Sequence, residues 1–187
     1  MWYILLGTIA FVFFFFFDVY TLNNEGTKKK IFGIIGLSIF IYSSLMVTLI
    51  SEKINFPLPI KIIAFMFLLV VAFLLIYSLF LALPFAKTYT KVQHNSELVD
   101  TGAYALCRHP GVLWFGFLFF FLFFASGSVL LIYAGIIWTS IDVLHVYLQE
   151  KFFFCKIFPE YKTYITTTPM LIPTKSSIKK CITTLHY

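Results

Sequence analysis

The sequence predicts an all-α protein that crosses a membrane several times, and two observations lead to this prediction. Hydrophobic residues make up 60% of the 187 residues and charged residues only 12%, whereas soluble domains carry about 25% charged residues. The apolar residues are also concentrated in five long stretches. A domain of this size leaves much of its surface exposed, so a chain this apolar needs lipid around it rather than water.

Each stretch is predicted to form a transmembrane helix, because a span takes about 20 apolar residues. The stretches cover residues 2–17, with an extension past Asp18 to Leu22 left open, then 31–50, 62–86, 112–125 and 129–148. The fourth is short, so we expect it either to tilt or to form a tight hairpin with the fifth. Neither a basic segment nor a small-residue cleavage pattern accompanies the first stretch, which favours a retained helix over a signal peptide.

Lysine and arginine are distributed unevenly between the two ends of these helices. Twelve of the 14 lie in the first and third connections and in the C-terminal tail, and only Lys53 and Lys61 lie in the second connection. Because positive residues stay in the cytoplasm, we expect an outside N-terminus and a cytoplasmic C-terminus. The net charge of +6 is mostly this bias. No soluble basic domain that would bind nucleic acid is apparent.

The three cysteines, Cys107, Cys155 and Cys181, all fall on the predicted cytoplasmic side. Thiols stay reduced there, and the spacing of these three matches no metal site. They are expected to be free thiols, and no metal is predicted.

The chain is predicted to have three parts: transmembrane helices over residues 1–86, a core with the polar chemistry over 87–173, and a basic tail over 174–187. Ionisable residues at membrane depth are costly and point to function. They gather before the fourth helix and at the end of the fifth, at His94, Glu97, Asp100, Arg108, His109, Asp142, His145 and Glu150. We expect both groups to meet at one membrane face. The alternative is that they are merely solvated interfacial residues.

Common soluble active-site motifs are absent from the sequence. It has no phosphate-binding glycine loop, no dinucleotide-binding glycine pattern, no HExxH zinc motif and no nucleophile elbow. Any active site must therefore be built from the ends of membrane helices. Pro110 is expected at the start of the fourth helix, whose free N–H groups would favour an anion.

The run LVDTGAYALCRHP, from Leu98 to Pro110, resembles a segment of the isoprenylcysteine carboxyl methyltransferases and phospholipid methyltransferases of membranes. In these enzymes an L-V-x-x-G-x-Y segment is followed by R-H-P, a helical hairpin, a glutamate, an aromatic segment and a final proline. The corresponding residues here are Glu150, the FPEY segment at 158–161, Tyr164 and the prolines 169 and 173. The resemblance covers residues 90–173.

The resemblance implies that S-adenosylmethionine is the cofactor and that its methyl group passes in line to a lipid or a prenylated acceptor. Glu150 is expected to bind the ammonium of the cofactor, and His109 is expected to help hold its carboxylate. The cofactor-binding set is Ser96, Glu97, Leu98, Val99, Gly102, Tyr104, His109, Pro110, Gly111, Val112 and Glu150. Arg108 and Glu150 are the catalytic candidates, and Arg108, Trp114 and His145 are the substrate-binding candidates.

The sequence departs from the family's pattern at several positions. Val112 replaces a frequent tyrosine, Gln149 replaces one of two acidic residues, and Val146 stands where the carboxyl methyltransferases place an arginine for the substrate carboxylate. The predicted partners are membrane lipid and a lipophilic methyl acceptor, and a phospholipid amine, a prenyl compound, a thiol and a carboxylate all remain open. Two alternatives are a reductase related to the NADPH-dependent sterol reductases and an inactive scaffold with the same fold.

Overall fold

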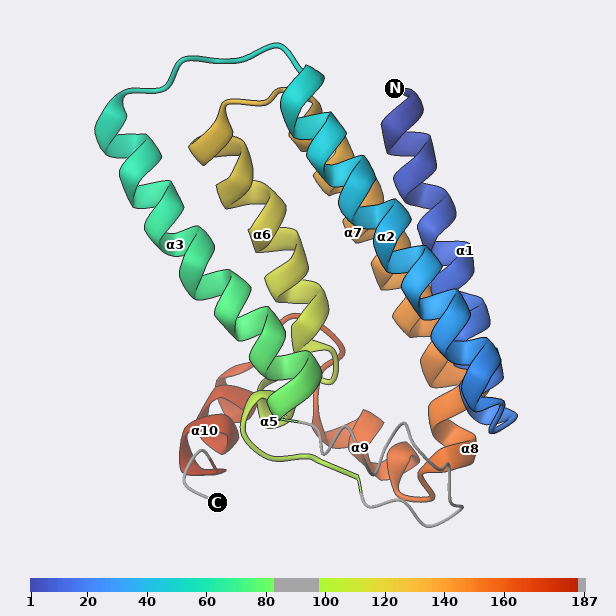
Figure 1. Ribbon diagram of the computed structural model, residues 1–187. Coiled ribbons are helices and arrows are strands. Elements are labelled where there is room, and N and C mark those ends of the chain that lie inside the picture. Colours follow the sequence, from blue (N-terminus) through green and yellow to red (C-terminus); the bar gives the residue numbers. More distant parts are fainter. Residues whose placement is uncertain (83–97, 185–187) are drawn as a thin grey trace.

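The computed structural model describes residues 1–82 and 98–184, and this part of the chain is helical, with no named strand. The bundle contains five apolar helices: α1 (Trp2–Leu22), α2 (Gly26–Ile50), α3 (Leu58–Ile76), α6 (Pro110–Ser126) and α7 (Leu130–Gln149). Two of them continue as π-helical turns, α3 into η1 (Tyr77–Leu81) and α7 into η2 (Glu150–Phe154). The short helices α5 (Ala103–Leu106), α8 (Cys155–Ile157), α9 (Tyr161–Thr167) and α10 (Lys175–Thr184) gather at one end of the bundle (Figure 1). The N-terminus lies at the opposite end.

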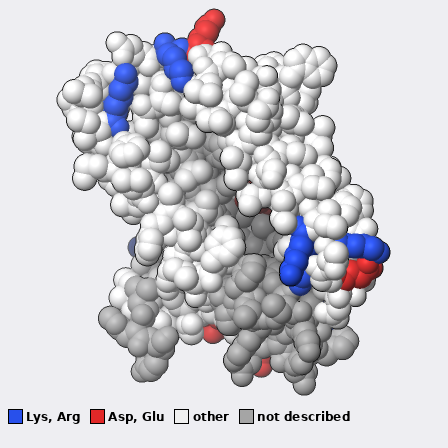
Figure 2. All heavy atoms as spheres, viewed as in Figure 1, with Lys and Arg blue, Asp and Glu red and all other residues white. Residues whose placement is uncertain are grey.

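Four helical segments are long and apolar enough to cross a membrane, namely Trp2–Leu22, Gly26–Ile50, Leu58–Leu81 and Leu130–Ile157. The fifth, α6, is also apolar but has only 17 residues, which extend over about 25 Å. In Figure 2, charged side chains lie toward the two ends of the visible face and a broad uncharged surface lies between them. The protein is therefore an all-α, multi-pass membrane protein, as the sequence predicts.

The helix boundaries extend the predicted stretches. The first helix continues past Asp18 to Leu22, and the second begins at Gly26 rather than at residue 31. The connection between them is short because Asn24 takes a left-handed conformation with φ of 54°. The predicted end of the third stretch, at residue 86, lies outside the described residues.

The centre of the bundle is a core around Trp138, which is fully buried. Its indole Nε1 donates a hydrogen bond to the carbonyl oxygen of Ile4, at 3.0 Å. A Cβ atom on Gly7 would lie 2.3 Å from the indole ring, so glycine is required where α1 passes this ring. The other buried members of the core are Ile4, Phe11, Val47, Phe119, Leu131 and Ala134. The core thus joins α1, α2, α6 and α7.

The turn between α6 and α7 is the tight hairpin that the short fourth stretch allowed. Gly127 ends α6 with φ of 74°, a left-handed conformation that glycine adopts without steric cost. Its carbonyl oxygen accepts a hydrogen bond from the N–H of Ile54 at 2.8 Å. The Ser128 hydroxyl donates to the carbonyl oxygen of Val47 at 3.1 Å. The hairpin is therefore fixed both to α2 and to the connection between α2 and α3.

Candidate functional site

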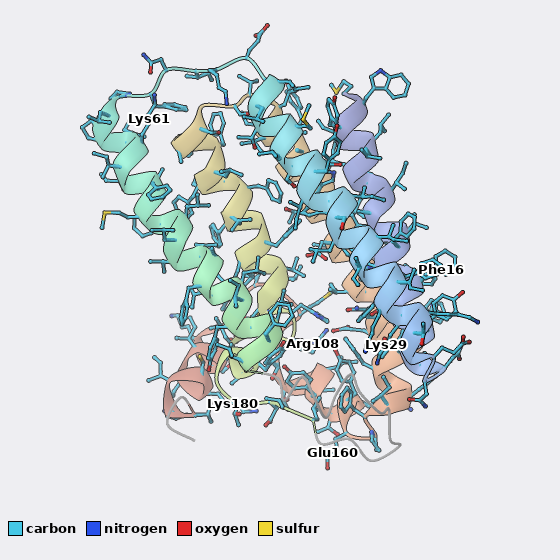
Figure 3. All side chains as sticks on the ribbon, viewed as in Figure 1. Phe16, Lys29, Lys61, Arg108, Glu160 and Lys180 are labelled. Atoms are coloured by element: carbon cyan, nitrogen blue, oxygen red, sulfur yellow. The ribbon has the colours of Figure 1, made fainter. Side chains whose placement is uncertain are left out.

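The site is a buried ionic cluster of three residues at the end of the bundle opposite the N-terminus. Arg108 and His109 lie between α5 and α6, and Glu150 is the first residue of η2. Each of the three is only 8% exposed. Figure 3 marks Arg108 where the bundle helices meet the short helices. Pro110 follows as the first residue of α6, as predicted.

The carboxylate of Glu150 is the centre of this cluster. Arg108 binds it through two donors, Nε to Oε1 at 2.7 Å and Nη2 to Oε2 at 3.1 Å. His109 Nε2 lies 2.8 Å from the same Oε1, and the Tyr161 hydroxyl donates to it at 3.1 Å. A bidentate arginine and two further donors compensate the cost of burying this charge.

Arg108 also holds the C-terminal segment in place. Its Nη1 donates to two carbonyl oxygens, that of Ile165 at 3.1 Å and that of Thr168 at 2.6 Å. The backbone N–H groups of Arg108 and His109 donate to the carbonyl oxygens of Pro169 and Met170, at 2.9 and 3.2 Å. The cluster is therefore both a polar centre and the anchor of the segment that follows α9.

Burial sets the protonation of the neighbouring groups. It lowers the pKa of His109 below its usual value, although the hydrogen bond to Glu150 works in the opposite direction. The imidazole is then neutral near pH 7, and its Nε2–H donates to the carboxylate. Burial and the nearby charge of Glu150 raise the pKa of Tyr161 above its usual range, so its hydroxyl stays protonated and remains a donor.

A second polar cluster joins α1 to α7 inside the bundle. His145 Nε2 lies 2.8 Å from Asp18 Oδ2, and Gln149 Nε2 donates to the same oxygen at 2.8 Å. His145, predicted to contact the substrate, is thus paired with Asp18. Asp18 was not among the predicted site residues, although it is the one charged residue in the first apolar stretch, and an isolated charge in a span signals such a partner.

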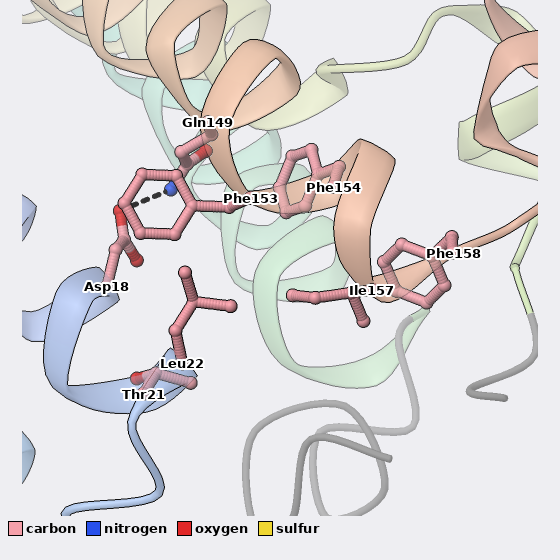
Figure 4. A pocket seen from close by; sticks show the side chains of 8 residues that line it. All are labelled: Asp18, Thr21, Leu22, Gln149, Phe153, Phe154, Ile157 and Phe158. Atoms are coloured by element: carbon pink, nitrogen blue, oxygen red, sulfur yellow. Dashed lines mark hydrogen bonds between the residues drawn. The ribbon is translucent and has the colours of Figure 1, made fainter. Parts of the chain in front are cut away.

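A small cavity lies next to this second cluster (Figure 4). Its volume is ≈ 30 Å³, which is room for a water molecule or two. Phe154 lines the cavity, and its ring is stacked 6.0 Å from that of His109 in the Glu150 cluster. The lining residues are Asp18, Thr21, Leu22, Gln149, Phe153, Phe154, Ile157 and Phe158.

Two of the predicted site residues contact η1, the turn that continues α3. The Tyr104 hydroxyl donates to the carbonyl oxygen of Ser78 at 2.9 Å, and Trp114 Nε1 donates to the Ser78 hydroxyl at 3.1 Å. A Cβ atom on Gly111 would lie 3.1 Å from the Leu79 side chain. The π-helical turn η1, which carries Ser78 and Leu79, therefore packs against α5 and the start of α6.

The remaining predicted residues either lie outside the described part of the chain or lie in α6 and in the segment before α5. Ser96 and Glu97 lie outside the described residues, as does His94. Leu98 packs against the aromatic cluster of Phe158, Tyr161 and Tyr164. Gly102 has φ of 56° and donates its N–H to the Thr184 hydroxyl at 2.9 Å. The others are Val99, which follows Leu98 in the segment before α5 that is neither helix nor strand, and Val112, which is buried in α6.

The chain matches no protein-family model, and comparisons with curated proteins and with solved structures find no significant match. The resemblance to the membrane methyltransferases therefore depends on the residues quoted above.

The Glu150 cluster fits the amino-acid end of S-adenosylmethionine in its chemistry. That end carries an ammonium and a carboxylate. Glu150 Oε2 accepts one hydrogen bond, from Arg108, and a carboxylate oxygen has room for another. One N–H of the Arg108 Nη2 group is not used in the bonds described above. The adjacent cavity of ≈ 30 Å³ is too small to hold a whole cofactor by itself.

Proposed function

We propose that this protein transfers methyl groups from S-adenosylmethionine to a lipophilic acceptor at the membrane surface. The observation that carries this proposal is the contact of Glu150 with Arg108 and His109. Glu150 follows Arg108 by 42 positions and His109 by 41. The methyltransferase pattern contains the same R-H pair and glutamate on either side of a helical hairpin.

In this proposal the chain's residues bind and orient the reactants. Glu150 Oε2 receives the ammonium of the cofactor, while the free Arg108 N–H and the N–H groups at the start of α6 receive the carboxylate. When bound, the cofactor supplies a sulfonium methyl group. The methyl group would pass to the acceptor's lone pair, and the electron pair of the broken carbon–sulfur bond would stay with the cofactor. Such a step needs close, in-line positioning and little water, and the buried, aromatic surroundings of Glu150 favour both.

The proposal includes an orientation in the membrane. The end that carries the site also carries most of the lysines, so we assign it to the cytoplasmic side. The N-terminus then lies outside.

The first test is binding of S-adenosylmethionine to the purified protein in lipid nanodiscs by calorimetry. We expect the wild type to bind it and the variant Glu150→Gln to lose at least tenfold in affinity, which is about 1.4 kcal/mol. The variant Glu160→Gln is a matched control, because Glu160 is an exposed carboxylate ten positions further along the same segment and should leave binding unchanged.

Two results would overturn the proposal: no binding by the wild type, or equal binding by Glu150→Gln. Because Glu150 also holds the structure together, Tyr161→Phe serves as a second, milder variant. It removes one hydrogen bond to Glu150 and leaves the ion pair with Arg108 intact. Thermal unfolding of each variant, measured in the same nanodiscs, separates loss of binding from loss of the fold.

An inactive scaffold is the second candidate, and one observation favours it. Glu150 Oε1 already accepts from Arg108, His109 and Tyr161, so the cluster is satisfied without a ligand. A scaffold of this kind would retain the stability supplied by the cluster but would neither bind the cofactor nor transfer a labelled methyl group to lipid.

A further inference from the structure

Helix α10 differs in character from the helices of the bundle. It is ten residues long and includes three lysines, at 175, 179 and 180. It packs against α5, at the end of the bundle where α3 finishes and α6 begins (Figure 1). Because α5 is separated from the apolar helix α6 by only three residues, α10 lies close to the level at which the bundle leaves the hydrocarbon.

One face of α10 is used for contacts within the protein. Ser177 is 3% exposed, Lys180 forms an ion pair with Asp100 at 2.6 Å, and the Thr184 hydroxyl accepts a hydrogen bond from the N–H of Gly102. Positions 177, 180 and 184 are spaced by three and four residues, so they share a face of the helix.

The opposite face, which we call the outer face, consists of Lys175, Ile178, Lys179 and Ile182. The two isoleucines are 44% and 61% exposed, and Ile172, just before the helix, is 80% exposed. No acidic residue occurs in α10. A helix face that meets only water is polar, whereas isoleucines interleaved with lysines are typical of a helix that lies in a membrane interface.

We propose that the outer face of α10 binds the anionic phospholipid headgroups of the membrane that the bundle crosses. The exposed Lys175 and Lys179 are complementary to phosphate and to a negative lipid surface. Ile178 and Ile182 lie on the same face, Ile178 between the two lysines and Ile182 one turn after Lys179, and they enter the boundary between headgroups and acyl chains. This surface and its partner do not depend on the proposed methyl transfer.

The inner contacts give lipid binding a consequence for the rest of the protein. The bonds to Asp100 and Gly102 connect α10 to the segment just before α5, which leads on to Arg108 and His109. Attachment of α10 to anionic lipid therefore also holds the segment of residues 98–102.

The test is amide hydrogen exchange of the full chain in nanodiscs of phosphatidylcholine alone and of phosphatidylcholine mixed with phosphatidylglycerol. We expect exchange in α10 and in residues 98–102 to be slower in the mixed discs, by about threefold to tenfold, and the difference to shrink at high salt. Equal exchange in both kinds of disc would overturn the proposal.

Matched variants locate the effect. The double variant Lys175→Gln, Lys179→Gln should abolish the dependence on phosphatidylglycerol. The control Lys156→Gln, Lys162→Gln removes the same charge from exposed positions at the same end of the chain and should preserve it. If both pairs act alike, net charge rather than α10 is responsible and the proposal fails. Protection that appears only with two chains per disc would also overturn it, because a second copy would then cover the outer face.

Discussion

Glu150 and Arg108 are the residues whose surroundings most restrict substitution. Burying an ion pair is costly, so the pair itself adds little net stability, but removing one partner leaves the other charge buried and unpaired. Arg108 also donates to the carbonyl oxygens of Ile165 and Thr168. Its loss therefore removes the anchor of the C-terminal segment together with the ion pair.

We expect Arg108→Ala to lower the free energy of unfolding by about 3–5 kcal/mol. Arg108→Lys should restore only part of this, because a single ammonium cannot donate to both carboxylate oxygens and to two carbonyls in the same planar geometry. Thermal unfolding in detergent is the measurement. Lys162→Ala, at an exposed position of α9, is the control and should unfold like the wild type. Equal stability of Arg108→Ala and wild type would show that the cluster does not hold the tail.

At the scale of single elements, the hairpin between α6 and α7 depends on Gly127. A side chain there has to adopt a left-handed conformation, and its Cβ atom would lie 2.2 Å from the carbonyl oxygen of Ile54. We expect Gly127→Ala to destabilise the protein by at least about 1–2 kcal/mol, the steric cost of that conformation. Gly26→Ala, at the start of α2, is the control, since a Cβ atom there has no neighbour within 4 Å. The two variants are compared by thermal unfolding, and equal melting temperatures would contradict this account of the turn.

The helices could be predicted from the sequence because long apolar runs have few alternatives in lipid, where backbone groups must be satisfied internally. The position of Arg108, His109 and Glu150 at one face of the bundle also followed, since a short hairpin returns the chain to the same face, but the direct ion pair between Arg108 and Glu150 was not predicted. The partner of His145 did not follow. Helical spacing places His145 and Gln149 on one face, but only the packing of α1 against α7 brings Asp18 to that face. The contacts of Arg108 with the carbonyl oxygens of the tail were also missed, because every residue has a backbone acceptor and the sequence does not show which one is used.

Across the whole molecule, the distribution of charge and the fold together lead to a topology that can be tested. The connection between α1 and α2 lies at the same end of the bundle as the Glu150 cluster, and the connection between α2 and α3 lies at the other end (Figure 1). Cysteines introduced at the exposed positions Thr27 and Glu52 therefore report on opposite ends. Cys155 and Cys181 are replaced by serine in this background.

We expect a membrane-impermeant maleimide added outside intact cells to label Glu52→Cys at once and Thr27→Cys only after permeabilisation. The reason is that positive residues keep the end of the bundle with Thr27 and the Glu150 cluster in the cytoplasm. Cys107 is the internal control: it is fully buried, and burial raises its pKa to about 11, so almost no reactive thiolate is present near pH 7. Its labelling should require denaturation. The reverse pattern would place the Glu150 cluster outside the cell and remove the positive-inside argument for a cytoplasmic site. Labelling of both introduced cysteines from the same side would contradict the crossing of α2 itself.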